Sequence, residues 1–444
     1  MNRGVLAAIL SALMLTLGAS HFAPSPANGS VVLAQAQATT SAAALQRLFS
    51  ADTVQADWFT ASILQQVPLA QAQAAIANIH ATLGSFQSVQ TTPDGFLVAF
   101  DRGGLPVQAT LDSQGRFSTL AIGAPQFNDP QVGLKTGAAE ILALPGSTSL
   151  LIQQNGQDLV ASNTDRPLGV GSAFELAVTA ALRSQIDAGT YSWDRVVALA
   201  PDWKTLPSGI LQNWPDAAPL TLSTLASLMV SASDNTAADG LITILGRPVI
   251  ETVAPNNRPF PTPHEVYVLK DPANADLLSR WRAGDTGARM QVLIDADGRN
   301  DPALTVFAGG TLLATDVEWF FSARDLCTLM GKVQDLPLMS IDTGPANRQD
   351  WAWVAYKGGF EPGAVNATLW LRDSSGTAYC LAATWNGTQP VDQSRFNDAV
   401  RQIVGSLAGL GPTVFTGPIT IPPLAPIPVP SSAAPATATP TPSR

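Results

Sequence analysis

The spacing of apolar side chains predicts a short helical segment at the start of the chain and then a group of strands. From Ser41 to about Leu83, apolar residues recur every three or four positions, which is typical of amphipathic helices. Three alternating runs follow, separated by turn residues at Pro93-Asp94-Gly95, Gly103-Gly104 and Ser113-Gln114-Gly115. Helices followed by an antiparallel meander predict a small α+β domain over residues 41–128, without a nucleophile or a ligand cluster.

The rest of the pattern predicts a second, larger domain over residues 136–410. It opens with a hairpin, Ser147–Gln154 and Gln157–Ser162 around the turn Asn155-Gly156, and a mostly helical stretch runs from Ser172 to about Met330. Further strands are predicted at Trp351–Lys357, Asn366–Asp373 and Thr377–Trp385, and a closing helix at Asp392–Leu407. We therefore expect an α+β fold in which one antiparallel sheet is completed from both ends and flanked by helices.

The two ends of the chain have the composition of processing and tail segments. Residues 1–38 read as a secretory signal peptide, since Arg3 precedes an apolar run from Val5 to Leu17 that is too short to span a bilayer. An uncleaved anchor is the alternative. Residues 411–444 are rich in Pro, Ala and Thr, which predicts a disordered tail. We expect a periplasmic or secreted protein with no membrane span after cleavage.

Composition narrows the range of partners. The 444 residues are 46% apolar and 13% charged, with a formal net charge of −10 and no long Lys/Arg run, so nucleic acid is not an expected partner. Cys327 and Cys380 lie in apolar stretches and have no metal-ligand companions. We expect two buried free thiols rather than a disulfide, and neither a metal nor another cofactor.

Three separated segments carry the candidate chemistry. Ser172 opens an apolar helix, where backbone N–H groups and the helix dipole favour the negative charge that develops on a nucleophile. Ser233-Asp234-Asn235 supplies a hydroxyl and an amide. Lys357-Gly358-Gly359 ends a predicted strand with a cation, and its glycines allow a ligand to approach the backbone.

Taken in this order, the three segments resemble the penicillin-recognising serine hydrolases, whose pattern is S-x-x-K, S-D-N and K-T-G. The resemblance to class A β-lactamases spans residues 136–410. It looks closest to the branch typified by the clavulanate-cluster serine hydrolase, in which a steroid-isomerase-like domain precedes the β-lactamase-like one. The supporting stretches are Pro259–Lys270, Val317–Phe320 and Lys357–Gly363.

The resemblance implies an acyl-serine mechanism on a β-lactam, amide or ester, and with it a role in antibiotic response. Ser172 would be the nucleophile, Ser233 would shuttle protons and Lys357 would bind a carboxylate. Asn235, Gly358 and Gly359 would contact the substrate, and the backbone N–H groups of Ser172 and Phe360 would form the oxyanion hole. Peptidoglycan is a further candidate partner.

Glu175 departs from the family pattern, because it stands where the family has the Lys of S-x-x-K. Two interpretations remain open. Glu175 is a base that pairs with Lys357 when substrate is absent. Alternatively, Ser172 and Glu175 form a capping box in a catalytically degenerate protein that binds a ligand or has a structural role in the envelope.

The other departures from the family pattern, and the other motifs in the sequence, do not indicate a different class of function. Gly358 replaces a hydroxyl residue, and there is no E-x-x-L-N motif, since Glu265 reads as part of a helix start with Pro263 at its first position. Of the three histidines, His21, His80 and His264, only the last lies near the candidate site, so a Ser-His-Asp triad is not favoured. Asp295-Ala296-Asp297-Gly298 reads as a turn rather than a calcium loop.

Overall fold

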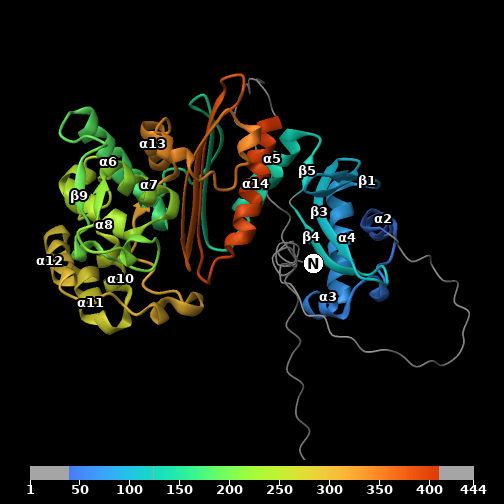
Figure 1. The fold of residues 1–444 in the computed structure, drawn as a ribbon, viewed down its shortest axis with the longest axis horizontal. Coiled ribbons are helices and arrows are strands. Elements are labelled where there is room, and N and C mark those ends of the chain that lie inside the picture. The colour runs from blue at the N-terminus through green and yellow to red at the C-terminus, as the bar shows by residue number, and fades with distance from the viewer. Residues whose placement is uncertain (1–39, 124, 410–444) are drawn as a thin grey trace, which may run out of the picture.

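The computed structural model describes residues 40–123 and 125–409. The predicted signal peptide and the Pro-rich tail, together with His21, lie outside the described residues. The described chain has the expected α+β architecture, with helices and antiparallel sheets. Figure 1 shows a helical block, a central sheet and a separate smaller sheet with its own helices. None of the helices in these two ranges is long and apolar enough to cross a membrane.

The smaller sheet is formed by residues that precede Asn128. Its elements are α2 (Ser41–Ser50), α3 (Ala61–Gln66), α4 (Leu69–Leu83), β1 (Phe86–Thr92), β2 (Gly95–Phe100), β3 (Gly103–Leu111), β4 (Phe117–Ile122) and β5 (Gln126–Phe127). The strand order is β1-β2-β3-β4, with β5 on β3, and the helices pack on this sheet through one hydrophobic cluster. Five strands form where three runs were predicted. The predicted turn at Gly103-Gly104 is wrong, because the chain turns at Asp101-Arg102 and both glycines lie in β3.

The larger sheet has the predicted composition, with strands from both ends of the second region. Its strands are β6 (Ser147–Gln154), β7 (Gln157–Ser162), β12 (Trp353–Glu361), β13 (Ala364–Arg372) and β14 (Ala378–Asn386). All neighbours are antiparallel in the order β12-β13-β14-β6-β7. The hairpin around Asn155-Gly156 has the predicted bounds.

Ten α-helices belong to this part of the described chain, and some of them cover the two faces of the sheet. They are α5 (Pro130–Leu142), α6 (Glu175–Asp187), α7 (Leu222–Ala232), α8 (Asn235–Leu245), α9 (Arg247–Glu251), α10 (Pro263–Lys270), α11 (Ala275–Ala283), α12 (Thr286–Asp297), α13 (Ala323–Val333) and α14 (Gln393–Gly409). Because strand residues alternate between faces, Leu150 and Ile152 pack with α5 and α14, whereas Leu151 packs with α6 and α13. The predicted domain start at residue 136 falls inside α5.

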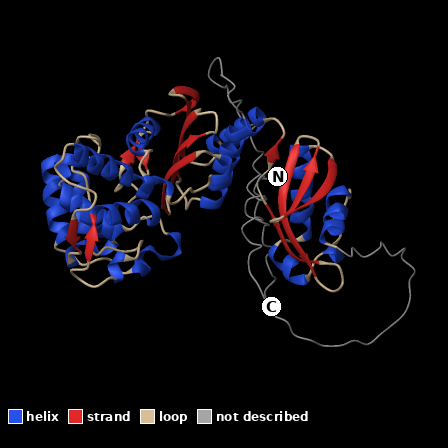
Figure 2. Ribbon diagram, turned by 45° about the horizontal axis from the view of Figure 1, so that its top comes forward, coloured by secondary structure: helices blue, strands red, loops and turns tan. Residues whose placement is uncertain are grey.

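Figures 1 and 2 place the α5–α14 pair between the large sheet and the small one, with the helical block on the opposite face of the large sheet. The block contains α6 to α13, and it meets the sheet mainly through α13 and through the 3-10 turn Gly171–Phe174 that precedes α6. The segments with the candidate chemistry therefore come together where the helical block contacts the edge strand β12.

The two cysteines form a disulfide, so the expectation of two free thiols is wrong. Cys327 on α13 and Cys380 on β14 have Cα atoms 6.0 Å apart, within the usual range for a bridge. Both side chains face the same hydrophobic cluster between α13 and the sheet. Cysteines in apolar stretches can therefore form a disulfide, and here the packing of α13 on β14 brings the two sulfur atoms together.

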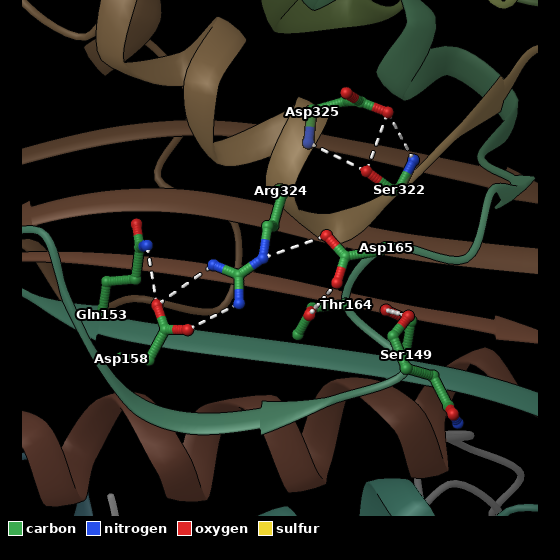
Figure 3. Close-up of polar contacts among 9 residues, drawn as sticks. Ser149, Gln153, Asp158, Thr164, Asp165, Ser322, Arg324 and Asp325 are labelled. Carbon is green, nitrogen blue, oxygen red and sulfur yellow. Dashed lines mark hydrogen bonds and ion pairs between the residues drawn. The ribbon is translucent and has the colours of Figure 1, made fainter. Parts of the chain in front are cut away.

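Polar contacts fix the start of α13 against the other edge of the sheet (Figure 3). The Arg324 guanidinium contacts Asp158 Oδ2 of β7 at 2.7 Å and Asp165 Oδ1 at 3.1 Å. Ser322 and Asp325 form a capping box at the first turn of the same helix. The helix that holds one end of the disulfide is therefore anchored at its N-terminus as well.

Candidate active site

Ser172 lies in a tight turn that packs against strand β12. The turn is a 3-10 helix, Gly171–Phe174, which leads into α6. Gly171 has φ of +52°, and a Cβ there would lie 3.0 Å from the Phe360 backbone nitrogen. A Cβ on Gly359 would lie 1.9 Å from the Val170 carbonyl oxygen. Glycine is therefore required at both positions to bring the turn and the strand this close.

A cavity of about 370 Å³ opens in front of this turn. Its lining includes six of the eight predicted site residues: Ser172, Ser233, Lys357, Gly358, Gly359 and Phe360. The three segments of the sequence thus meet at one cavity. Among the described residues that line it, Asn235 and Glu175 are absent, and both side chains are buried behind its surface.

Glu175 and Lys357 form a buried ion pair, as one of the two interpretations predicted. The distance from Lys357 Nζ to Glu175 Oε2 is 2.8 Å, and the two side chains are 2% and 0% exposed. Burial raises the pKa of the Glu175 carboxyl to about 8, although the ammonium of Lys357 opposes the rise. A carboxyl in this state exchanges a proton near neutral pH.

The alternative, a Ser172–Glu175 capping box, is wrong. The residue that caps α6 is Phe174, and no side chain caps the helix. A capping box requires Glu175 three residues after the cap, whereas the 3-10 turn makes Glu175 the first residue of α6. Within the described chain the Ser172 hydroxyl makes no hydrogen bond, so a structural contact does not occupy it.

The Lys357 ammonium has two further partners. Nζ donates a short hydrogen bond to the Ser233 hydroxyl and a 3.3 Å hydrogen bond to the Val230 carbonyl oxygen. Together with Glu175 these partners account for the three N–H donors of a lysine. Ser233 itself has a left-handed backbone, with φ of 47° and ψ of 48°, at the end of α7. An unfavourable conformation of a non-glycine residue beside a cavity is typical of functional sites.

The other two residues of Ser-Asp-Asn support the site from behind. Asp234, fully buried, accepts hydrogen bonds from the backbone N–H groups of Ala237 at 3.0 Å, Ile210 at 2.7 Å and Leu211 at 3.0 Å. It therefore ties the start of α8 to the neighbouring loop. The Asn235 amide donates to the Leu206 carbonyl oxygen at 3.1 Å and also contacts the Tyr267 phenol.

Two tyrosines that the sequence analysis did not select line the cavity, Tyr267 and Tyr356. A Cβ at Gly358 would lie 2.1 Å from the Tyr356 hydroxyl oxygen, so the phenol occupies the space of the missing side chain at 358. Burial, together with the charge of Asp342, raises the pKa of Tyr356. The strand alternation could have indicated this residue, because positions 356 and 358 share a face.

A second buried charge cluster lies beside the cavity. The Lys270 ammonium contacts Glu318 through a short bond and Glu361 Oε2 at 2.8 Å, and the Tyr267 hydroxyl donates to Glu361 Oε1 at 2.9 Å. Burial raises the pKa of Glu318 to about 7. Lys270, Glu318 and Glu361 come one each from the three sequence stretches that supported the family resemblance, Pro259–Lys270, Val317–Phe320 and Lys357–Gly363. The charge cluster thus joins these three stretches in the fold.

Glu265 and His264 have structural partners at the start of α10. Glu265 forms the predicted helix start, a capping box with Thr262, and contacts Arg247 Nη1 at 2.8 Å. The distance from His264 Nδ1 to Asp301 Oδ1 is 2.7 Å. The described residues contain no group of three or more acidic, His or Cys side chains that could hold a metal ion.

A protein-family profile matches a part of the chain that contains several of the candidate site residues. The profile of the β-lactamase enzyme family matches residues 139–257, which include Ser172, Ser233 and Asn235. This segment is therefore similar to that family. No curated protein sequence gives a match.

Several solved structures are similar in fold. A β-lactamase from Sphaerobacter thermophilus is 19% identical, covers 63% of this chain and 97% of its own, and has a TM-score of 0.40. A β-lactamase from Desulfarculus baarsii is 20% identical, with coverages of 63% and 98% and a TM-score of 0.43. The protein PBP-A is 17% identical, with coverages of 62% and 94% and a TM-score of 0.42.

Proposed function

We propose that this chain is an exported serine hydrolase that forms an acyl-enzyme on Ser172 from a β-lactam, amide or ester. One observation carries the proposal. Behind the cavity in front of the unbonded Ser172 hydroxyl lies a buried carboxyl, Glu175, whose pKa is raised to about 8 and which lies 2.8 Å from the Lys357 ammonium. Nucleophile, base and proton carrier are the parts that acyl transfer requires.

In the proposed reaction Ser172 Oγ attacks the carbonyl carbon, and its proton passes to the Glu175 carboxylate. The backbone N–H groups of Ser172 and Phe360 stabilise the oxyanion, because the two segments are in contact through Gly171 and Gly359. The leaving group receives a proton from the Ser233 hydroxyl, which regains one from the Lys357 ammonium, and Lys357 in turn takes the proton that Glu175 had accepted. Water then attacks the acyl ester and gives its proton to the Glu175 carboxylate, which passes it to Ser172 Oγ as the ester bond breaks and the acid product leaves.

A second candidate is a catalytically degenerate protein that keeps the cavity for binding or has a structural role in the envelope. It is favoured by the replacement of the S-x-x-K lysine with Glu175. It is also favoured because no hydrogen bond joins the Ser172 hydroxyl to either Glu175 oxygen in the described part of the chain. In both cases we propose a periplasmic or secreted location, with peptidoglycan as a candidate ligand. We also propose the two-domain organisation of the clavulanate-cluster branch, in which the small domain binds a further ligand.

Covalent labelling distinguishes the two candidates. Wild-type protein is incubated with a fluorescent fluorophosphonate or a fluorescent penicillin, and the labelled residue is identified by mass spectrometry. The hydrolase predicts labelling of Ser172 that disappears in Ser172→Ala and persists in Ser208→Ala, a matched control because Ser208 lines the same cavity. Fluorophosphonate labelling that is absent from the wild type, or unchanged in Ser172→Ala, refutes the hydrolase and favours the binding protein.

A further inference from the structure

The polar groups of the cavity indicate which substrates it accepts. This inference rests on the proposed function and narrows it. An acyl hydrolase that recognises a carboxylate beside the scissile bond needs a cation or several N–H and O–H donors directed at that carboxylate.

Lys357 is the only Lys or Arg among the described residues that line the cavity. Its side chain is 2% exposed, and its three donors are used by Glu175, Ser233 and Val230. This holds whether the proton lies on Glu175 or not, because a neutral carboxyl and a carboxylate both offer an acceptor oxygen. A substrate carboxylate would have to displace one of these buried partners to reach the ammonium.

Position 358 provides no replacement donor. Gly358 has no side chain, and the space next to it is filled by the Tyr356 ring, which also lies 2.4 Å from the position of a Cβ on Gly344. The ring is thus held between two glycines. The phenol offers a single neutral O–H to the cavity. Such a donor binds a carboxylate less strongly than an ammonium or a guanidinium group does.

The charge that does face the cavity is negative. Asp342 lines the cavity and is exposed, and its Oδ1 accepts the Gly344 backbone N–H at 2.9 Å, which holds the carboxylate at this position. The remaining side chains of the lining are neutral, among them Ser208, Gln393 and Asn397. A negative rim above a cation with no free donor repels an anionic substrate.

We propose that the cavity selects acyl substrates without a carboxylate near the scissile bond, in the order cationic, neutral, anionic, and that Asp342 is the residue that determines this preference. The substrate class is accordingly a neutral or cationic ester or amide. Penicillins and peptides that end in a free carboxylate are poor substrates of this cavity.

The test uses three esters of 4-methylumbelliferone that differ in charge at the end of the acyl chain: butanoate, the half-ester of butanedioate, and 4-(trimethylammonio)butanoate. We expect kcat/KM at low ionic strength to be highest for the cationic ester and lowest for the anionic one. In Asp342→Asn the cationic-to-anionic ratio falls about five-fold, as for one exposed charge. Asp350→Asn is the matched control, because Asp350 is also exposed but does not line the cavity.

Failure of the proposed function is distinguished by a binding measurement. The three corresponding amides are titrated into Ser172→Ala protein by calorimetry, so that the order of affinity is measured without turnover. The predicted order of affinities, lost in Asp342→Asn, supports the inference even if no ester is hydrolysed through Ser172. Preference for the anionic amide, equal affinities, no binding of any of the three, or an unchanged order in Asp342→Asn would overturn it.

Discussion

Substituting Glu175 with Gln should make the folded protein more stable than the wild type above pH 8 and should lower its kcat/KM. In the folded protein the Glu175 pKa is about 8, against an ordinary value of 4.5. The native state therefore binds this proton more tightly than the unfolded chain does, and the stability that the neutral carboxyl provides is complete below about pH 4.5 and is lost as pH rises through 8. One pKa unit corresponds to about 1.4 kcal/mol, so the loss amounts to roughly 5 kcal/mol over this window.

Glu175→Gln cannot ionise and should not show this loss. We expect the two proteins to be similarly stable at pH 5 and the variant to be more stable above pH 8, in denaturant titrations at a series of pH values. If Glu175 is the base, kcat/KM of the wild type rises through the same window, since the carboxylate is the active form, and the variant loses two to four orders of magnitude. Asp350→Asn serves as the control, because this residue is exposed and makes no buried pair.

Parallel stability curves for wild type and Glu175→Gln would refute the argument, because they would mean that the buried carboxyl does not titrate between pH 4.5 and 8. A wild-type rate that falls with pH in this window would separately exclude Glu175 as the base. The two readouts are independent, so a titrating but catalytically unimportant Glu175 would be recognised.

Three further substitutions test the packing around the site. Replacing both cysteines with Ser should lower the free energy of unfolding by about 4 kcal/mol, because the bridge closes a loop of 53 residues; equal denaturant midpoints for bridged and Ser-substituted protein would contradict this. Gly359→Ala should abolish Ser172 labelling by displacing the turn, whereas Gly405→Ala, where a Cβ meets nothing within 4 Å, should leave labelling intact. Lys270→Met should cost about 3–5 kcal/mol by leaving Glu318 and Glu361 without their cation, and a melting temperature within 1 °C of wild type by calorimetry would refute the role of the cluster.

The sequence predicted the architecture of the larger sheet with close bounds. The hairpin at Asn155-Gly156 and the returning strands follow from alternation and turn residues, which are local signals that a single strand or turn carries by itself. Of the predicted site, Ser172, Ser233, Lys357 and the three residues after Lys357 reach one cavity. Ser172 and Ser233 lie at helix ends, as predicted, whereas the predicted strand end at Lys357 is wrong, because β12 continues to Glu361. The Glu175–Lys357 pair was one of two alternatives that the order of residues left open.

What the tertiary structure decided concerns contacts between segments distant in the chain. It paired Cys327 with Cys380, brought Tyr356 into the space beside Gly358, and turned Asn235 toward Leu206 and Tyr267 instead of the cavity. Local periodicity fixes which face of an element is apolar, but not which residue of another element it meets. The sequence thus determined the elements and the candidate residues, whereas packing determined which of them face the cavity and with what charge.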